Sequence, residues 1–216
     1  MEKYFKNWLE ALEKYLEAKK LVLNVARFKV LVFGRKSSRK VWKWRGEGIE
    51  EVKEFTYLGF LFKKNENVED HVKERVKRAD IVMKKIWGIG ENLFKEDCPR
   101  RMRMFEALVR SVLMYGVEIW GWKEYEEVEK FHEKYIRWTL GLDRWTPWYI
   151  VLKEVNREKI KVRTGNMACK YEERLFESKG RTIVKACLKE RENGKGDDYG
   201  MKEREMYLNR CGWSKE

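Results

Sequence analysis

The sequence predicts an α+β fold that is predominantly α-helical, in which an N-terminal helix and a small antiparallel sheet precede a helical bundle. Three observations support this prediction. Short apolar or alternating runs, which are typical of strands, occur between residues 29 and 62. From Val68 onward, apolar residues recur at helical spacing. Only two of the 216 residues are proline while 39% are charged, and this composition favours long solvated helices.

The N-terminal part of the chain carries the signals of one helix and several short strands. Residues 3–20 are predicted to form an amphipathic helix, because Trp8, Leu12 and their neighbours recur on one face. Gly46 and Gly48 interrupt an alternating segment and are expected in a hairpin turn. The expected strands are a buried strand over 29–33, a hairpin over 41–52 and a single strand over 55–62.

Glycine, proline and capping residues divide the remaining chain into helices. Gly88 and Gly90 are expected to end the first of them, and Asp97 or Cys98 is expected to cap the second, with Pro99 in its first turn. The predicted segments are helices over 68–87, 97–120, 125–140 stopped by Gly141, 146–155, 158–192 with a break at Gly180, and 201–210, and a loop over 193–198.

The charge of the chain indicates its class of partner. A net charge of +13 and a pI near 9.5 favour polyanions, with nucleic acid the first candidate and an anionic membrane surface the second. No apolar stretch reaches the roughly 18 residues that a spanning helix needs, so no membrane-spanning segment is expected, and nucleic acid, not a membrane, is the partner favoured. The N-terminus is charged where a signal peptide would be apolar, which predicts an intracellular protein, nuclear or cytoplasmic.

Basic residues on the helix over 68–87 and at the start of the next helix are the candidate phosphate contacts. Acidic residues are interspersed among them, so a merely solvated helical face is the alternative. Tryptophan pairs at 42/44, 120/122 and 145/148 could stack on bases, but core packing is the favoured interpretation. The candidate contacts in this region are Lys73, Lys77, Lys84, Arg100 and Arg101.

Catalytic and metal-binding patterns are not evident in the sequence. Asp197-Asp198 follows a glycine, as in polymerase metal-binding turns, but its flanks are not apolar strands and favour a solvated loop. His132 has no partner histidine at helical spacing and is interpreted as structural. The four cysteines, at 98, 169, 187 and 211, have no two-residue spacing, so reduced thiols and no cofactor are expected.

Several ordered segments resemble one protein family. Residues 21–33 resemble the late palm motif of reverse transcriptases from non-LTR (LINE-type) retrotransposons, and Tyr57-Leu58-Gly59-Phe60 is similar to the primer-grip strand that follows it. Residues 110–122 resemble the thumb helix of the insect members of this family. The segments Tyr135-Ile136-Arg137-Trp138, Leu142-Asp143 and Thr146-Pro147 continue the match in order.

This resemblance implies three regions: the end of the palm over 1–64, a helical thumb-like domain over 65–155 and a charged helical extension over 156–216. It implies a primer-end contact at Tyr57, Leu58 and Gly59. It also places Lys29, which is retained where Arg27 and Phe28 replace the usual Lys and Ser or Thr, among the nucleic-acid contacts. The implied partners are an RNA–DNA hybrid or other duplex and the missing N-terminal portion of the polymerase.

The resemblance also bears on catalysis. The aromatic-Ala-Asp-Asp turn of the family is expected upstream of Leu21, where only a helix without aspartate is found. Because polymerase chemistry needs carboxylates that hold Mg²⁺, we expect a chain derived from an RNA-directed DNA polymerase to be inactive alone, with Mg²⁺ serving only the full-length enzyme. The alternatives are a basic helical interaction module and a transposon relic with no nucleic-acid role.

Overall fold

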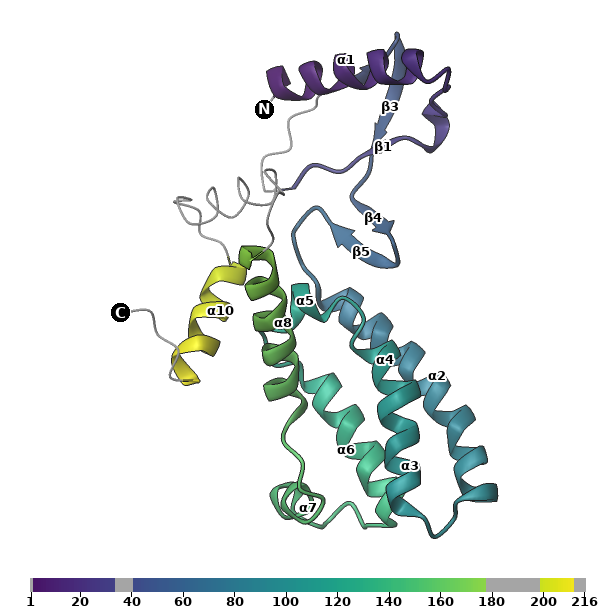
Figure 1. The fold of residues 1–216 in the computed structure, drawn as a ribbon, viewed down its shortest axis with the longest axis vertical. Coiled ribbons are helices and arrows are strands. Elements are labelled where there is room, and N and C mark those ends of the chain that lie inside the picture. Colours follow the sequence, from purple (N-terminus) through teal and green to yellow (C-terminus); the bar gives the residue numbers. More distant parts are fainter. Residues whose placement is uncertain (1, 34–40, 178–198, 212–216) are drawn as a thin grey trace. The chain divides into compact units, whose positions relative to one another are not determined.

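The computed structural model describes residues 2–33, 41–177 and 199–211, and its α+β, predominantly helical fold matches the prediction. The chain forms two compact units, Met1–Asp70 and His71–Glu216, drawn from purple to blue and from blue to yellow in Figure 1. The division falls in the first turn of α2, a few residues beyond the boundary expected near 64. Residues 71–155 and 156–216 belong to the same compact unit.

The first unit contains one long helix, a three-stranded sheet and a separate hairpin. In the sheet, whose order is β1-β3-β2, β2 is antiparallel to β3, but β1 is parallel to it. The sheet is therefore mixed, and the strand expected over 29–33 is only two residues long. The elements are α1 (Glu2–Ala18), η1 (Val25–Arg27), β1 (Lys29–Val30), β2 (Trp42–Trp44), β3 (Glu47–Glu51), β4 (Glu54–Tyr57) and β5 (Phe60–Lys63).

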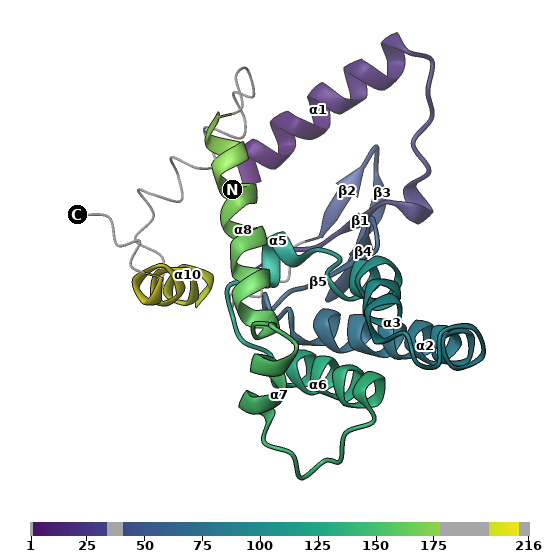
Figure 2. The same cartoon turned by 60° about the horizontal axis from the view of Figure 1, so that its bottom comes forward.

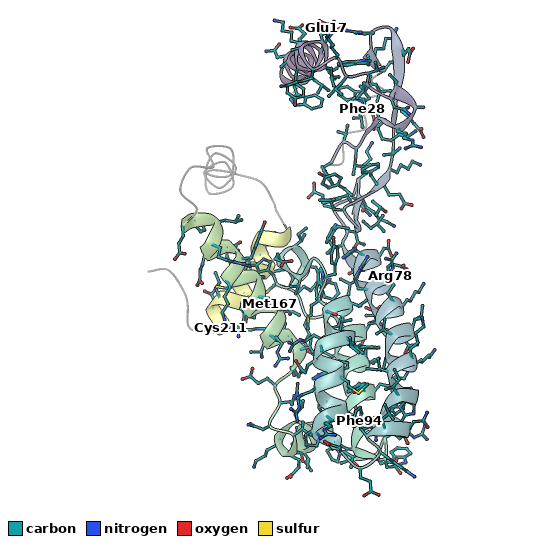
Figure 3. All side chains as sticks on the ribbon, turned by 45° about the vertical axis from the view of Figure 1, so that its right-hand side comes forward. Glu17, Phe28, Arg78, Phe94, Met167 and Cys211 are labelled. Carbon is teal, nitrogen blue, oxygen red and sulfur yellow. The ribbon has the colours of Figure 1, made fainter. Side chains whose placement is uncertain are left out.

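The hairpin predicted over 41–52 is confirmed, with its turn at Arg45-Gly46, but Gly48, also expected in the turn, lies in β3 opposite Lys43. Both turn residues have positive φ, 48° and 88°, which is the backbone of the two-residue turns that suit the twist of a hairpin. Arg45 is also an anchor for α1, because its guanidinium donates to Glu13 at 2.5 Å and to Glu17. Glu17 is labelled in Figure 3.

The single strand predicted over 55–62 is wrong, because the chain reverses in its middle. β4 and β5 pair in an antiparallel hairpin with Tyr57 opposite Phe60. Leu58 and Gly59 form the turn, with φ of 47° and 78°. A leucine rarely adopts positive φ, so the turn lacks the Asn-Gly or Asp-Gly signal that would have identified it, and Gly59 alone is a weak one.

The second unit is a helical bundle. In both Figure 1 and Figure 2, α2, the rod formed by α3, η2 and α4, and α6 lie side by side. The shorter α5 packs against α8. The elements are α2 (Glu69–Leu93), α3 (Cys98–Met104), the π-helix η2 (Phe105–Val109), α4 (Arg110–Leu113), α5 (Val117–Trp120), α6 (Glu126–Leu140), α7 (Trp148–Glu154), α8 (Ile160–Glu177) and α10 (Tyr199–Arg210).

Two helix boundaries differ from the prediction. α2 continues through Gly88 and Gly90, because packing of its last turns outweighs the roughly 1 kcal/mol cost of each glycine. In that region Trp87 packs against Trp138 of α6, with ring centroids 5.1 Å apart. The helix predicted over 97–120 is divided by the π-helical turn of η2 and by Gly116, whose φ is 73°.

The predicted end signals of the other helices are confirmed where they depend on local chemistry. Asp97 caps α3, since its carboxylate accepts the backbone N–H of Arg100 at 2.9 Å. Gly141 ends α6 in the left-handed conformation, with φ of 64°. The helices expected before residue 155 and over 201–210 correspond to α7 and α10, whereas the predicted break at Gly180 and loop at 193–198 lie outside the described residues.

The core of the bundle is aromatic and lies between η2 and α6. The Phe105 ring stacks on Tyr135 at a centroid distance of 4.1 Å and on His132 at 5.8 Å. The Tyr135 hydroxyl donates to the backbone carbonyl of Arg101 at 2.5 Å, so its polar end is satisfied where burial is nearly complete. These contacts fix α6 against the α3–η2–α4 rod.

α8 packs against α5 and α10 through close contacts at two glycines. A Cβ atom on Gly121 would lie 2.6 Å from the Thr164 carbonyl oxygen, and one on Gly165 would lie 2.1 Å from the Tyr207 ring. Tyr207 packs with Trp122 in a small cluster. Figure 3 labels Met167 on α8 and Cys211 just after α10. Glycine is therefore needed at both positions so that α8 can approach its neighbours.

Candidate nucleic-acid interface

α2 presents a row of lysines on the side opposite its buried face. Val72, Ala79 and Met83 are fully buried in the bundle, while four lysines at helical spacing are exposed. We call these four residues the α2 lysine stripe: Lys73, Lys77, Lys84 and Lys85. Arg78, which is labelled in Figure 3, is also exposed, but its guanidinium is held by Glu74 at 2.8 Å.

The lysines of the stripe differ in how they are paired. Lys73 Nζ lies 4.0 Å from Glu127, and Lys84 Nζ lies 2.8 Å from Asp80. Asp80 also accepts from Lys134 of α6, and these two ammonium groups lower the pKa of its carboxyl. Exposed pairs of this kind are worth at most about 1 kcal/mol, so a phosphate can replace the carboxylate. In the described part of the chain, Lys77 and Lys85 have no carboxylate at ion-pairing distance.

Arg100 and Arg101 are adjacent in sequence but lie in different environments. Arg100 is on the surface, where it pairs with Asp97 at 2.9 Å and covers the Phe94 ring. The side chain of Arg101 is only 7% exposed; its guanidinium lies over Trp87 at 4.4 Å and 2.8 Å from Glu91. Arg101 therefore holds α3 against α2, and the structure removes it from the predicted phosphate contacts.

The predicted sites in the first unit are located as follows. Tyr57 and Leu58 are exposed at the tip of the β4–β5 hairpin, with 59% and 74% of their surface accessible, and Gly59 completes the turn. Lys29 forms an ion pair with Glu50, its partner residue on β3. Lys29 is thus engaged within the sheet, whereas Tyr57 and Leu58 are exposed to solvent.

In the three tryptophan pairs singled out in the sequence, the side chains are buried or partly buried, with Trp145 as the exception. Trp44, Trp120 and Trp122 are buried. Trp148 packs edge-on against His132 at 6.0 Å. Trp145, in contrast, is 76% exposed, and the Arg144 guanidinium lies over its ring, 4.8 Å from the centroid. An exposed indole stacked on a guanidinium can stack on an unpaired base.

A second basic cluster was not predicted from the sequence, and we call it the arginine pocket. Arg110, Arg157 and Arg163 all contact the carboxylate of Glu106, the last with its Nη1 3.0 Å from Oε2. They come from α4, the segment before α8, and α8 itself. Because Arg110 is far in sequence from Arg157 and Arg163, no local pattern connects the three, and the only usable signal was the position of Arg110 on the thumb-like helix.

No group of three His, Cys, Asp or Glu side chains that could hold a metal is found within residues 2–33, 41–177 and 199–211. The Asp197-Asp198 pair lies outside these ranges. Likewise, none of the helices built from the described residues has the length and apolar character to cross a membrane. Searches with models of protein families, against curated proteins and against solved structures find no match to this chain.

Proposed function

We propose that the second unit binds duplex nucleic acid through its phosphates, as the thumb-like part of a chain derived from a non-LTR reverse transcriptase. The α2 lysine stripe is the observation that carries this proposal. Its four lysines lie on a helix whose opposite face is fixed in the bundle, so the cations are presented on a rigid support. The net charge of +13 would attract a polyanion toward this unit.

The dimensions of the stripe suit a duplex. From Lys73 to Lys85 the helix rises roughly 18 Å at 1.5 Å per residue, and each strand of B-form DNA carries a phosphate about every 3.4 Å. Several phosphates can therefore face the stripe at once. Lysines contact phosphates as point charges and read no base edges, so the proposed binding is independent of sequence.

The same proposal assigns a role to the first unit. Tyr57, Leu58 and Gly59 at the hairpin tip contact the primer end, and the N-terminal portion of the polymerase is the protein partner. The chain positions an RNA–DNA hybrid without adding nucleotides, because its sequence contains no aromatic-Ala-Asp-Asp run to hold Mg²⁺. Nucleotide incorporation by the purified protein would contradict this part of the proposal.

A basic helical interaction module without a nucleic-acid role is the competing function. The pairing of Lys73 with Glu127 and of Lys84 with Asp80 favours it, because paired cations on a helix also occur on simple solvated faces. The two functions differ in the response to salt. Binding through phosphates releases counterions and weakens as salt increases, whereas a solvated face shows no salt-dependent affinity for duplexes.

The test is fluorescence anisotropy of a labelled RNA–DNA hybrid titrated with the full chain at several salt concentrations. We expect the logarithm of the affinity to fall linearly with the logarithm of the salt concentration. Replacing all four stripe lysines by glutamine should reduce the magnitude of that slope by roughly 3 to 4, at about 0.9 per lost phosphate contact. Unchanged binding in this variant would refute the assignment of the stripe.

A matched control removes the same charge from other exposed positions. The control variant replaces Lys14, Lys43, Lys53 and Lys170, which are exposed and lie outside α2, by glutamine. It lowers the net charge equally, so it is expected to weaken long-range attraction while retaining most of the salt slope. An equal loss in the two variants would show that binding depends on total charge and not on α2.

A further inference from the structure

The arginine pocket is a cavity of about 590 Å³ inside the second unit. Its wall is contributed by η2, α4, α6, the connection between α7 and α8 and the first turn of α8. One part of the wall is apolar, with Phe105, Val155 and Ile160, and another part is cationic. Cavities of this size are typical of sites for small organic ligands, and the mainly polar, charged lining of this one favours an anionic ligand.

The cationic part of the wall has more positive charge than its own acid neutralises. Arg110, Arg157 and Arg163 share the single carboxylate of Glu106, which leaves an excess of two positive charges in this group. Lys159 and Glu158 also line the cavity, with opposite charges, and Lys159 pairs with Glu124 at 3.2 Å outside it. Burial and the mutual repulsion of the arginines lower the pKa values of Arg110 and Arg163.

A buried histidine in the wall has an unused polar atom. His132 is 3% exposed, and its Nδ1 has no hydrogen-bond partner among the described residues. An unsatisfied buried nitrogen costs about 1–3 kcal/mol, so a ligand that donates or accepts a hydrogen bond there would gain free energy. The pocket also borders the π-helical turn of η2, and π-bulges recur at functional sites.

We propose that the arginine pocket binds a phosphomonoester, with its phosphate on the three arginines and its organic part against the apolar wall and His132. The charge decides between anions. A phosphomonoester carries a charge of about −1.5 to −2 at neutral pH, which matches the excess of two, whereas a carboxylate would neutralise only half of it. Each guanidinium presents a planar fork that fits phosphate oxygens.

This inference goes beyond the duplex binding proposed above and does not depend on it. None of the stripe residues Lys73, Lys77, Lys84 and Lys85 lines the cavity. The stripe is a surface for the backbone of a duplex, while the pocket accepts one phosphate group and its substituent. The substitutions in the stripe variant would therefore leave the pocket intact. Failure of one proposal can thus be distinguished from failure of the other.

The test is isothermal titration calorimetry of the full chain with adenosine monophosphate, inorganic phosphate and adenosine. We expect the monophosphate to bind, phosphate to bind more weakly because it lacks the organic part, and adenosine to show no measurable binding. A dinucleotide with a 5′-phosphate, compared with its 5′-hydroxyl form, distinguishes a free nucleotide from a chain end as the source of the phosphate. Equal binding of adenosine and its monophosphate would overturn the proposal.

Variants and a spectroscopic signal locate the binding. Arg163→Gln, at the most exposed of the three arginines, should weaken monophosphate binding at least tenfold, while Arg78→Gln on α2 should leave it unchanged. In the wild-type chain, the nuclear magnetic resonance signal of His132 should shift and saturate with the calorimetric affinity. A signal that stays fixed at saturation would overturn the proposal even if Arg163→Gln failed to fold.

Discussion

Arg100 and Arg101 show how the environment of a residue decides its role when composition cannot. Both are basic residues in the first turn of α3, and the sequence predicted the same contact for both. Only Arg101 faces α2, where it stacks on Trp87 and pairs with Glu91 across the α2–α3 turn. The ion pair is close but not aligned as a hydrogen bond, so the stack and the carbonyl of Lys95, at 3.2 Å, also hold the guanidinium.

Replacement of Arg101 and of Arg100 by alanine should therefore have different effects on stability. Arg101→Ala leaves a cavity over Trp87 and removes the partner of Glu91, and we expect a loss of about 2–4 kcal/mol in the free energy of unfolding. Arg100→Ala removes only an exposed pair and should cost less than about 1 kcal/mol. Urea unfolding followed by tryptophan fluorescence measures both. Equal losses would contradict the structural role of Arg101.

At the scale of elements, the sequence predicted the features that depend on a few neighbouring residues. The Asp97 cap, the Gly141 helix end and the hairpin turn at Gly46 each follow from local chemistry, and each is found in the structure. The hairpin at Leu58-Gly59 was missed because a leucine occupies a positive-φ position. The end of α2 was placed too early because packing, which the sequence does not display, overrides helix propensity.

The candidate sites also differ in whether they depend on neighbouring residues or on packing between distant elements. The α2 lysine stripe was largely predictable, because helical periodicity places Lys73, Lys77 and Lys84 on one face. The arginine pocket was not, because its cations come from separate elements and meet only in the folded bundle. The packing of α8 against α5 and α6 brings Arg110, Arg157 and Arg163 together. No local sequence pattern indicates this packing.

The course of α2 through Gly88 leads to a prediction about that helix. A Cβ atom on Gly88 would meet no atom within 4 Å, and the residue lies within the helix without positive φ. Gly88→Ala should therefore raise the free energy of unfolding by roughly 0.5–1 kcal/mol, through lower conformational entropy of the unfolded chain. Thermal denaturation followed by circular dichroism measures this change. Destabilisation would show that the helix does end near residue 88.

Gly165 in α8 provides the matched contrast. Here an alanine would place its Cβ within 2.1 Å of the Tyr207 ring and force that ring away. The Tyr207 hydroxyl would then lose its hydrogen bonds to the Val162 carbonyl, at 3.1 Å, and to Asn166, at 3.2 Å. We expect Gly165→Ala to lower the free energy of unfolding by about 1–3 kcal/mol. The opposite signs at Gly88 and Gly165 distinguish open helix surface from a close helix contact.

At the scale of the whole molecule, the groups whose pKa values are shifted by folding together determine how stability depends on pH. Burial lowers the pKa of both histidines of the chain, and for His132 it reaches about 4, with Arg157 and Arg163 adding to the effect. Cationic partners lower the pKa of carboxyl groups such as Asp80, so these groups also favour the folded state as the pH rises through the acid range. Glu129 acts in the opposite direction, because its burial raises its pKa.

The lowered pKa values of the histidines predict that the protein loses stability as the pH falls from about 7 to 5. The unfolded chain binds a proton at His132 near the ordinary pKa of 6.5, whereas the folded chain does so only near 4, so the unfolded state takes up more protons in that window. The contribution of His132 to the free energy of unfolding is fully present above pH 6.5 and decreases as the pH falls. Between pH 7 and pH 5 this decrease is about 2 kcal/mol.

His132→Leu isolates this contribution, because leucine cannot titrate and the other shifted groups are unchanged. Urea unfolding at a series of pH values should give a wild-type curve that falls below pH 6.5, and a variant curve with most of that decline removed. The decline that remains in the variant is attributed to His71, whose pKa is also lowered by burial. If the two curves stayed parallel, His132 would have to take up its proton in the folded state near its ordinary pKa, and its burial would not be the source of the pH dependence.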